Sequence, residues 1–335
     1  MKAAFKAGKE RFDVREVETP AIKPDECLIK ISYCAVCVWC YKEWLRDGND
    51  DMYGPGVTGH EMSGVIGKVG ANVRKWKPGD EVLTYFWWHC GTCPECKQGK
   101  TTYCMNPVSS RHVKGGYAQF VVAAEQCILP SPRGMDLKYA GLITDMVGTA
   151  MHAIRRAFSV GISRDVVAVW GLGPVGLFTV QGLRTFKEVK RIIGIDPVKS
   201  RRDVALCLGA GEVLDPSQED TVERLLAENG GRGVDYAFNC ALSSSEAAYE
   251  TLKIDGYLMN ITGGCLSVSQ CEKRVDGSFY FFKSEYEENL QLVMDGKIKL
   301  EPLLTHEFPL DEINEAMELR SKQPERSLKV TIRCS

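Results

Sequence analysis

The sequence lacks long apolar runs, a surplus of one charge and low-complexity segments. Its 335 residues carry a net charge of −2, with lysine and arginine spread along the chain. This balance does not favour a polyanion-binding surface, so we expect no nucleic-acid partner. No stretch of about eighteen apolar residues is available to cross a bilayer, so we expect no membrane partner. The N-terminal "MKAAFKAGKERF" lacks the apolar run of a signal peptide, and we expect a cytoplasmic enzyme.

Cysteine, by contrast, is abundant. The chain holds 14 cysteines, a number that would suggest disulfides in a secreted protein. Because no signal peptide is recognised, we expect metal ligands and reduced core thiols among them instead. Their spacing has to decide which are which.

Two kinds of local pattern divide the chain, whose length already favours two domains. The first 140 residues contain short apolar runs such as "CLIKISYC" and "DEVLTYFWW", broken by Gly, Pro and Asp as strands are. From about 150 to 285, apolar strands such as "VVAVWG" and "RIIGID" alternate with helical stretches. That alternation predicts βαβ units on a parallel sheet, and hence an α/β fold.

A glycine-rich turn lies between one such strand and the helix that follows it. "VVAVWGLGPVGLFTVQGL" places Gly171, Gly173 and Gly176 in G-x-G-x-x-G spacing. The first glycine permits the tight turn, the second lets a pyrophosphate approach the backbone, and the third lets helix and strand pack closely. The alternative is a glycine turn without a ligand. The predicted dinucleotide-binding residues here are Gly171, Leu172, Gly173, Pro174, Val175, Gly176, Asp196 and Arg201.

Asp196 bears on which dinucleotide is bound. It lies twenty residues beyond Gly176, where a carboxylate accepts hydrogen bonds from the adenosine ribose. Its charge would repel a 2′-phosphate, which favours NAD. Lys199, Arg201 and Arg202 follow closely, so NADP stays open.

Four cysteines form a compact motif in "CGTCPECKQGKTTYC". Their spacing is C-x2-C-x2-C-x7-C, which suits tetrahedral zinc in a closed sulfur shell with no position open for chemistry. An iron–sulfur cluster is the alternative. We therefore predict a structural zinc held by Cys90, Cys93, Cys96 and Cys104.

The order of these motifs resembles the zinc-dependent medium-chain dehydrogenase/reductase family, which includes alcohol and polyol dehydrogenases. The similarity covers nearly the whole length. It rests on the cysteine at 37, "GHE" at 59 to 61, "VGANVRKWKPGDEV", the four-cysteine lobe, "GGYAQF", the glycine motif and "GKIKLEPLLTHEFPLDEINEAM". It implies a GroES-like β-rich catalytic domain over 1–146 and 286–335, with a zinc lobe at 90–104. A Rossmann NAD-binding domain with a doubly wound parallel sheet is implied over 147–285, and we expect a homodimer or homotetramer.

The resemblance also implies a catalytic zinc, so that each chain would hold two zinc ions, one catalytic and one structural, and use NAD. Cys37 and His60 match the first two ligands, and Asp145 in "LITDMVGTAMHA" matches the third. A buried, hydrogen-bonded carboxylate is the alternative for Asp145. Glu61 matches a glutamate that can approach the metal, and Thr149 a threonine that packs on the nicotinamide. Hydride would then pass between the nicotinamide and a carbon whose oxygen lies on zinc.

The stretch "CAVCVWCYKEW" departs from the family's pattern. Relatives usually carry Ser or Thr two residues after the ligand cysteine, as a proton relay, and Asp at the third position. Trp39 and Cys40 stand there instead, and an indole N–H cannot accept a proton. Cys40 is either a buried thiol behind the ligands or a replacement ligand, and Cys34 is most simply a core residue.

Three explanations for the missing relay are open. Another group carries the proton, with Lys42, Tyr41 and His112 as candidates. Glu61 or zinc-bound water does this work. Or the substrate needs no such relay, as for an activated C=C or C=N bond.

The predicted substrate pocket is aromatic. By the resemblance Phe86 faces the substrate, with Trp39 beside it and Arg111 and His112 near the pocket as cations for an anionic group. Arg111 could equally be a solvated loop residue. We predict an NAD-dependent zinc dehydrogenase that interconverts a secondary alcohol (polyol, sugar phosphate or cyclic hydroxy compound) and its ketone. A reductase of an activated C=C or C=N bond is the alternative, and a non-catalytic nucleotide-binding protein is a third.

Overall fold

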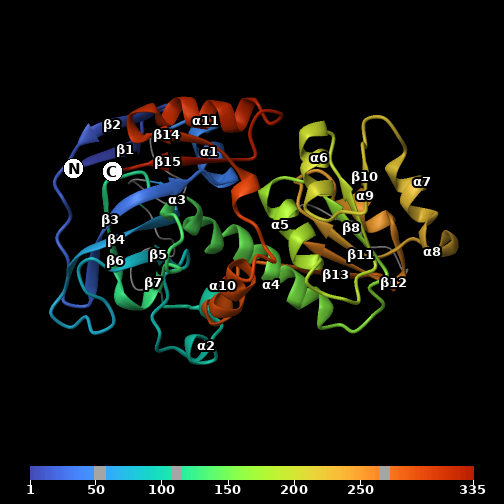
Figure 1. Cartoon of the computed structure of the whole chain (residues 1–335), viewed down its shortest axis with the longest axis horizontal. Coiled ribbons are helices and arrows are strands. Elements are labelled where there is room, and N and C mark those ends of the chain that lie inside the picture. Colours follow the sequence, from blue (N-terminus) through green and yellow to red (C-terminus); the bar gives the residue numbers. More distant parts are fainter. Residues whose placement is uncertain (49–57, 107–114, 264–271) are drawn as a thin grey trace. The chain divides into compact units, whose positions relative to one another are not determined.

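The computed structural model describes residues 1–48, 58–106, 115–263 and 272–335, and the chain divides into two compact units (Figure 1). The first unit comprises Met1–Asp145, Phe282–Tyr286 and Leu300–Ser335. The second comprises Met146–Phe281 and Glu287–Lys299.

A mixed β-sheet forms the centre of the first unit. Its order is β14-β15-β3-β4-β5-β7, and β6 also pairs with β3. β14 and β15 are parallel, while the other pairs are antiparallel. The strands are β3 (Glu26–Ala35), β4 (Glu61–Val69), β5 (Glu81–Thr84), β6 (Phe120–Ala124), β7 (Ile128–Pro130), β14 (Leu304–Pro309) and β15 (Lys329–Arg333); β1 (Lys2–Lys6) and β2 (Phe12–Glu16) form a separate pair.

The alternation of side chains along β3 explains how this sheet covers a core. Cys27, Ile29 and Ile31 are buried, whereas Lys30 between them is exposed. Since successive side chains of a strand point to opposite faces, one face of β3 meets the core. The same strand runs on toward Cys37, so its pairing with β4 and β15 also places the segments that bear the candidate site.

Helix α1 (Val38–Leu45) is anchored at its C-terminal end. Lys6 donates hydrogen bonds from Nζ to the carbonyls of Trp44 (3.0 Å) and Arg46 (2.7 Å), where a helix leaves carbonyls unpaired. Trp44 Nε1 also donates to Asn314 Oδ1 of α11 (Ile313–Lys322) at 3.0 Å. The short helices of this unit are α2 (Pro94–Lys97), α3 (Leu137–Ala140), η1 (Thr101–Tyr103), η2 (Glu125–Cys127), η3 (Gly141–Ile143), η4 (Lys283–Glu285), η5 (Glu301–Leu303) and η6 (Leu310–Glu312).

The second unit is built on a parallel sheet of order β10-β9-β8-β11-β12-β13. Its first strand, β8, lies in the middle, and the chain winds outward from it in both directions, so the sheet is doubly wound. The elements are β8 (Val166–Trp170), β9 (Arg191–Ile195), β10 (Glu212–Leu214), β11 (Val234–Asn239), β12 (Leu252–Asn260), β13 (Arg274–Gly277), α4 (Met146–Phe158), α5 (Pro174–Leu183), α6 (Lys199–Cys207), α7 (Thr221–Leu226), α8 (Glu228–Gly231), α9 (Ser245–Glu250) and α10 (Tyr286–Met294). Every residue of β8 and β11 is buried, as expected for strands covered on both faces. The predicted α/β fold class is confirmed.

The two units differ from the predicted domain boundaries in the C-terminal part. The prediction placed 286–335 in the first domain, but Glu287–Lys299 lies in the second unit. An ion pair between Arg155 and Glu288 (3.1 Å) ties α10 to α4. Gln181 of α5 also exchanges two hydrogen bonds with the backbone of Lys299, at 3.1 and 2.7 Å. These contacts, rather than a pattern in the sequence, assign the segment.

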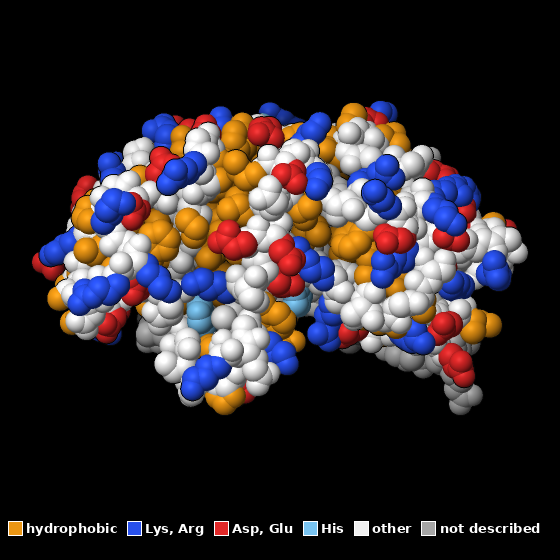
Figure 2. Space-filling view, turned by 60° about the horizontal axis from the view of Figure 1, so that its bottom comes forward, with side chains coloured by type: hydrophobic (Ala, Val, Ile, Leu, Met, Phe, Trp, Pro, Cys, Tyr) orange, Lys and Arg blue, Asp and Glu red, His pale blue; other side chains and the backbone are white. Residues whose placement is uncertain are grey.

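The surface carries charges of both signs. Figure 2 shows basic and acidic side chains interspersed over the face in view. Among the helices of the described residues, none is both long enough and apolar enough to cross a membrane.

We predict that Gly176→Ala lowers the free energy of unfolding by about 2–3 kcal/mol, as overpacking does. A Cβ at Gly176 would lie 1.8 Å from the carbonyl oxygen of Gly171, a backbone atom that cannot move aside cheaply. Gly173→Ala is the matched control, because a Cβ there meets nothing within 4 Å and φ is −70°. It should change stability by less than about 0.5 kcal/mol. Equal stability of the two variants in chemical denaturation would contradict the close helix–strand approach.

Candidate metal and dinucleotide sites

Four ionisable side chains from distant parts of the chain meet inside the first unit. Cys37 is the N-cap of α1, and Glu61 begins β4 directly after His60. Asp145 lies between η3 and α4. Each of these four residues offers one potential ligand atom, and these four atoms all lie within 4.8 Å of one another. All four residues are buried. The structure thus brings together the predicted catalytic ligands and the adjacent glutamate.

Contacts on three sides hold the imidazole of His60. Its Nε2 lies 3.3 Å from Asp145 Oδ2, toward the group of ligands. Its Nδ1 lies 3.9 Å from Cys40 Sγ. The ring of Phe86 meets it edge to face, with centroids 4.4 Å apart. Phe86, predicted to face a substrate, therefore also supports a candidate ligand.

A buried lysine that the sequence analysis did not single out completes the group. Lys329, the first residue of β15, donates a hydrogen bond from Nζ to Glu61 Oε1, and both side chains are fully buried. Glu61 Oε2 is buried too and has no hydrogen-bond partner in the described structure. The only signal in the sequence was a lysine inside the strand-like run "SLKVTIRC", which does not reveal its partner.

The electrostatics of the group favour a cation among these side chains. Burial raises the pKa of the Cys37 thiol to about 11, and burial raises the pKa of Glu61 to about 7 against the opposing charge of Lys329. For His60, burial acts to lower the pKa, but interactions with Cys40, Asp145 and Cys37 outweigh it and raise the pKa well above its usual value. For Asp145, burial acts to raise the pKa, but the hydrogen bond with His60 prevails and the pKa is lowered. A divalent cation would reverse the effect of burial on Cys37 and Glu61 and favour their deprotonated forms.

The donors fit zinc. One thiolate, one imidazole and carboxylate oxygens are the ligands that zinc takes in proteins. The unpartnered Oε2 of Glu61 is a buried acceptor that a metal ion or its bound water would satisfy. With Cys37, Glu61 and Asp145 deprotonated the group carries three negative charges. The ammonium of Lys329 and one divalent cation together balance them.

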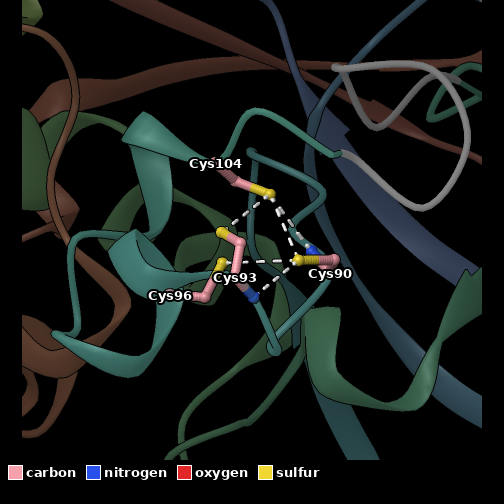
Figure 3. Close-up of side chains that lie close together, drawn as sticks. All are labelled: Cys90, Cys93, Cys96 and Cys104. Atoms are coloured by element: carbon pink, nitrogen blue, oxygen red, sulfur yellow. Dashed lines mark hydrogen bonds between the residues drawn. The ribbon is translucent and has the colours of Figure 1, made fainter.

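The four predicted lobe cysteines also converge (Figure 3). The Sγ atoms of Cys90 and Cys104 are 3.6 Å apart, those of Cys93 and Cys104 3.9 Å, and those of Cys90 and Cys96 4.0 Å. Tetrahedral zinc with Zn–S bonds of about 2.3 Å requires S···S separations of about 3.8 Å. The sulfurs thus have the spacing of a closed zinc site, and all four cysteines are free of disulfides.

Backbone amides of this lobe donate hydrogen bonds to its sulfur atoms, which favours the thiolate form. Thr92 N–H and Cys93 N–H donate to Cys90 Sγ at 3.4 and 3.3 Å, and Cys90 N–H donates to Cys104 Sγ at 3.3 Å. The hydrogen bonds from Thr92 lower the pKa of Cys90 to about 6. Lys283 N–H donates to Thr101 Oγ1 at 3.0 Å, so the segment Phe282–Tyr286 fastens the lobe from a distant part of the chain.

The glycine turn of the second unit has the geometry that its spacing predicts. Gly171 follows β8 with φ +88°, a conformation that favours glycine, and Gly173 is the N-cap of α5. Asp196 follows β9, and its carboxylate accepts hydrogen bonds from Leu172 N–H and Val198 N–H, both at 2.8 Å. Each carboxylate oxygen still has a second lone pair, so this acid braces the turn and keeps acceptor capacity for a ribose.

The cations near Asp196 have acidic partners. Arg201 lies 3.6 Å from its Oδ2. Arg202 pairs with Asp215 at 2.8 Å and donates to the Asp196 carbonyl, and Lys199 pairs with Asp203. A 2′-phosphate would have to compete with these carboxylates for the cations.

The remaining predicted residues are placed as follows. Trp39 is 41% exposed, a partly exposed side chain rather than a buried wall, and Lys42 Nζ lies 4.8 Å from the centre of its ring. The ring of Tyr41 lies under the guanidinium of Arg320, with the ring centre 5.4 Å from Arg320 Cζ. Thr149 is buried on α4 in the second unit. Arg111 and His112 lie outside the described residues.

We predict that Cys93→Ala lowers the thermal midpoint of unfolding by at least about 5 °C, because a structural zinc contributes its binding energy to folding. Cys207→Ala removes an exposed cysteine of α6 and should leave the midpoint within about 1 °C. Differential scanning calorimetry measures both. Similar midpoints for the two variants would show that the lobe does not depend on its four sulfurs.

We predict that Lys329→Met lowers the free energy of unfolding by about 3–5 kcal/mol, because it leaves a buried carboxylate without its cation. The double variant Glu61→Gln/Lys329→Met should recover part of that loss. Lys199→Met breaks the exposed pair with Asp203 and should cost less than about 1 kcal/mol. The free energies of unfolding are measured in urea. If Lys329→Met loses no more of this free energy than Lys199→Met, Lys329 and Glu61 do not form a buried ion pair.

Comparison with known proteins agrees with this geometry. Residues 23–133 match the alcohol dehydrogenase GroES-like domain, and residues 174–295 match the zinc-binding dehydrogenase model. Geraniol dehydrogenase from Carpoglyphus lactis is 28% identical over 91% of this chain and 90% of its own. S-(hydroxymethyl)glutathione dehydrogenase from Escherichia coli is 28% identical over 98% of both chains.

Among solved structures, alcohol dehydrogenase TADH from Thermus sp. ATN1 matches with a TM-score of 0.88 at 23% identity, over the whole of both chains. At that identity the likeness shows the fold alone. The two domain models together span most of the chain, in the order that the motifs predict. The chain belongs to the zinc-dependent medium-chain dehydrogenase/reductase family.

Proposed function

We propose that this protein is a zinc- and NAD-dependent dehydrogenase that interconverts a secondary alcohol and its ketone. The observation that carries the proposal is the buried group of Cys37, His60, Glu61 and Asp145, with Glu61 Oε2 unpartnered. The curated relatives are named for oxidation of hydroxyl groups, in geraniol and in S-(hydroxymethyl)glutathione. A hydroxyl compound is therefore the class of substrate that we propose.

In this proposal Cys37, His60 and Asp145 hold the catalytic zinc. When bound, zinc supplies Lewis-acid chemistry, which polarises the substrate oxygen and lowers the pKa of an alcohol. His60 is oriented by Cys40 on one nitrogen and by Phe86 against its ring. Such outer contacts decide which nitrogen faces the metal.

Glu61 has a separate role. Lys329 donates to one of its oxygens, and the other is a buried acceptor without a hydrogen-bond partner in the described structure. We propose that Glu61 would serve as a further ligand of the metal. Lys329 offsets one negative charge of the group through its ion pair with Glu61.

The second unit binds NAD in this proposal. The turn of Gly171–Gly176 with the start of α5 receives the pyrophosphate, and Asp196 receives the adenosine ribose. The pairing of Lys199, Arg201 and Arg202 with carboxylates supports NAD over NADP. Thr149 packs on the nicotinamide. The proposed total is two zinc ions per chain, the second in the four-cysteine lobe.

A second candidate function follows from Trp39. An indole cannot pass a proton, and Trp39 stands where relatives usually carry a hydroxyl relay. Lys42, whose Nζ lies over the same ring, is a side chain of α1 that can move a proton. Reduction of an activated C=C or C=N bond requires no removal of a proton from an alcohol hydroxyl, so it is the alternative reaction for this site.

A substrate screen tests the proposal. Polyols, sugar phosphates, cyclic hydroxy acids and enones are offered side by side, and NADH and NADPH are followed by absorbance. Turnover of a secondary alcohol with NAD is the expected result. Turnover of enones alone would favour the second candidate, and no turnover with either cofactor would refute both enzymatic proposals.

We predict that Asp145→Ala loses one of two zinc ions and at least about 100-fold in kcat, because the metal loses a ligand. Asp203→Ala removes an exposed carboxylate of α6 and should retain both zinc ions and the rate. Metal content is measured by atomic absorption on the purified chain. An Asp145→Ala variant with both ions and the original rate would remove Asp145 from the ligand set.

A further inference from the structure

The candidate ligand Cys37 belongs to a C-x-x-C pair at the start of a helix. Cys37 is the N-cap of α1 with extended φ and ψ (−79°, 158°), and Cys40 is the third residue of that helix. Cys40 N–H donates to the Cys37 carbonyl at 3.1 Å, so the two cysteines lie on one tight turn. Residues three apart on such a turn have Cα atoms about 5–5.5 Å apart, within the range that a disulfide spans.

The second thiol is held next to the ligands. Cys40 is buried and its Sγ lies 3.9 Å from Nδ1 of His60, while Cys37 contributes its sulfur to the group on the other side. Both cysteines therefore lie near the same imidazole, and their spacing along the turn is one that a disulfide can span. Both are reduced in the structure.

We infer that Cys37 and Cys40 form a redox-active dithiol, masked while Cys37 ligates the metal and oxidised to a disulfide once the metal leaves. The inference rests on the proposed function only in taking Cys37 as a ligand. The disulfide removes one of the three ligands, and a metal ion cannot return until the bond is reduced. Metal occupancy would thereby depend on the redox state around the protein.

The step balances with a peroxide as oxidant. The Cys37 thiol of the metal-free chain gives up its proton as its sulfur attacks hydrogen peroxide, the O–O bond breaks, and a sulfenic acid and water form. The Cys40 thiol then attacks the sulfenic sulfur, the S–O bond breaks, and water leaves. Two thiols and one peroxide thus give one disulfide and two water molecules. A molecule as small as peroxide needs no more room than the alcohol that the proposed reaction brings to the metal.

Two neighbouring thiols could compete for the same partner. Cys34 of β3 is buried in the same cluster, and Cys334 follows β15, whose Ile332 pairs with Cys34 in register. A test must therefore separate Cys37 from Cys34 as the partner of Cys40.

The full chain, as purified or after zinc removal with dipicolinate, is treated with hydrogen peroxide, alkylated under denaturing conditions and digested with trypsin. The peptide "ISYCAVCVWCYK", residues 31–42, contains Cys34, Cys37 and Cys40. Chymotryptic cleavage after Trp39 then separates Cys40 from the other two unless a disulfide joins the halves. The exposed Cys207 on α6 reports in each sample that the peroxide dose was effective.

We expect the halves to stay joined in the metal-depleted chain, at least about tenfold more often than in the metal-loaded chain. Cys34→Ser should keep the link, and Cys40→Ser should lose it. Zinc should rebind at this site only after a thiol reductant is added. Fully alkylated halves in the depleted wild type, despite a modified Cys207, would overturn the inference, as would loss of the link in Cys34→Ser.

This outcome is independent of turnover. A chain that forms the link but oxidises no alcohol refutes the proposed function and keeps the dithiol. A chain that oxidises alcohols but never forms the link refutes the dithiol alone. Equal linking with and without metal would overturn the masking of Cys37. If Cys40→Ser fails to fold, the presence or absence of the link in the wild type and in Cys34→Ser still tests the inference.

Discussion

The first unit depends on how it neutralises negative charge in a dry interior. A buried thiolate and two buried carboxylates repel one another, and each would lose several kcal/mol of solvation on leaving water. The ammonium of Lys329 offsets one of these charges through Glu61, and His60 shares a hydrogen bond with Asp145. The two negative charges that remain suit a divalent cation. Stability and metal binding are therefore properties of the same few atoms.

The sheet of the first unit makes this arrangement possible. Pairing of β3 with both β4 and β15 brings the ends of three strands together, and each end supplies one part of the site: Cys37 after β3, Glu61 at the start of β4, and Lys329 at the start of β15. Lys6 anchors the far end of α1, so that the helix holds Cys37 and Cys40 at the other end. A rigid frame of this kind is needed because a ligand misplaced by an ångström loses much of its effect.

The second unit depends on a close approach of two backbone segments, the start of α5 and the turn after β8. Gly176 allows α5 to pack against the turn after β8, and Asp196 fixes that turn by accepting two amide hydrogen bonds. The four-cysteine lobe depends on a third feature, the clustering of its sulfur atoms. None of the residues of α2 is buried, and the sulfurs of the lobe lie at the spacing of a closed metal site. Charge balance, close packing and thiolate clustering thus each determine one part of the molecule.

Local spacing in the sequence was sufficient for the fold class, the glycine turn and the four-cysteine lobe. Each of these depends on residues close together in the chain, where a strand, a turn or a loop determines the geometry almost by itself. Cys37, His60 and Asp145 are far apart in the chain, and only the resemblance to a family joined them before the structure did. The pairing of Lys329 with Glu61 across 268 residues, the contact of Cys40 with His60, and the transfer of Glu287–Lys299 to the second unit came from the tertiary structure alone. Contacts of this kind are determined by strand pairing and by the need to compensate buried charge, and neither leaves a periodic pattern in the sequence.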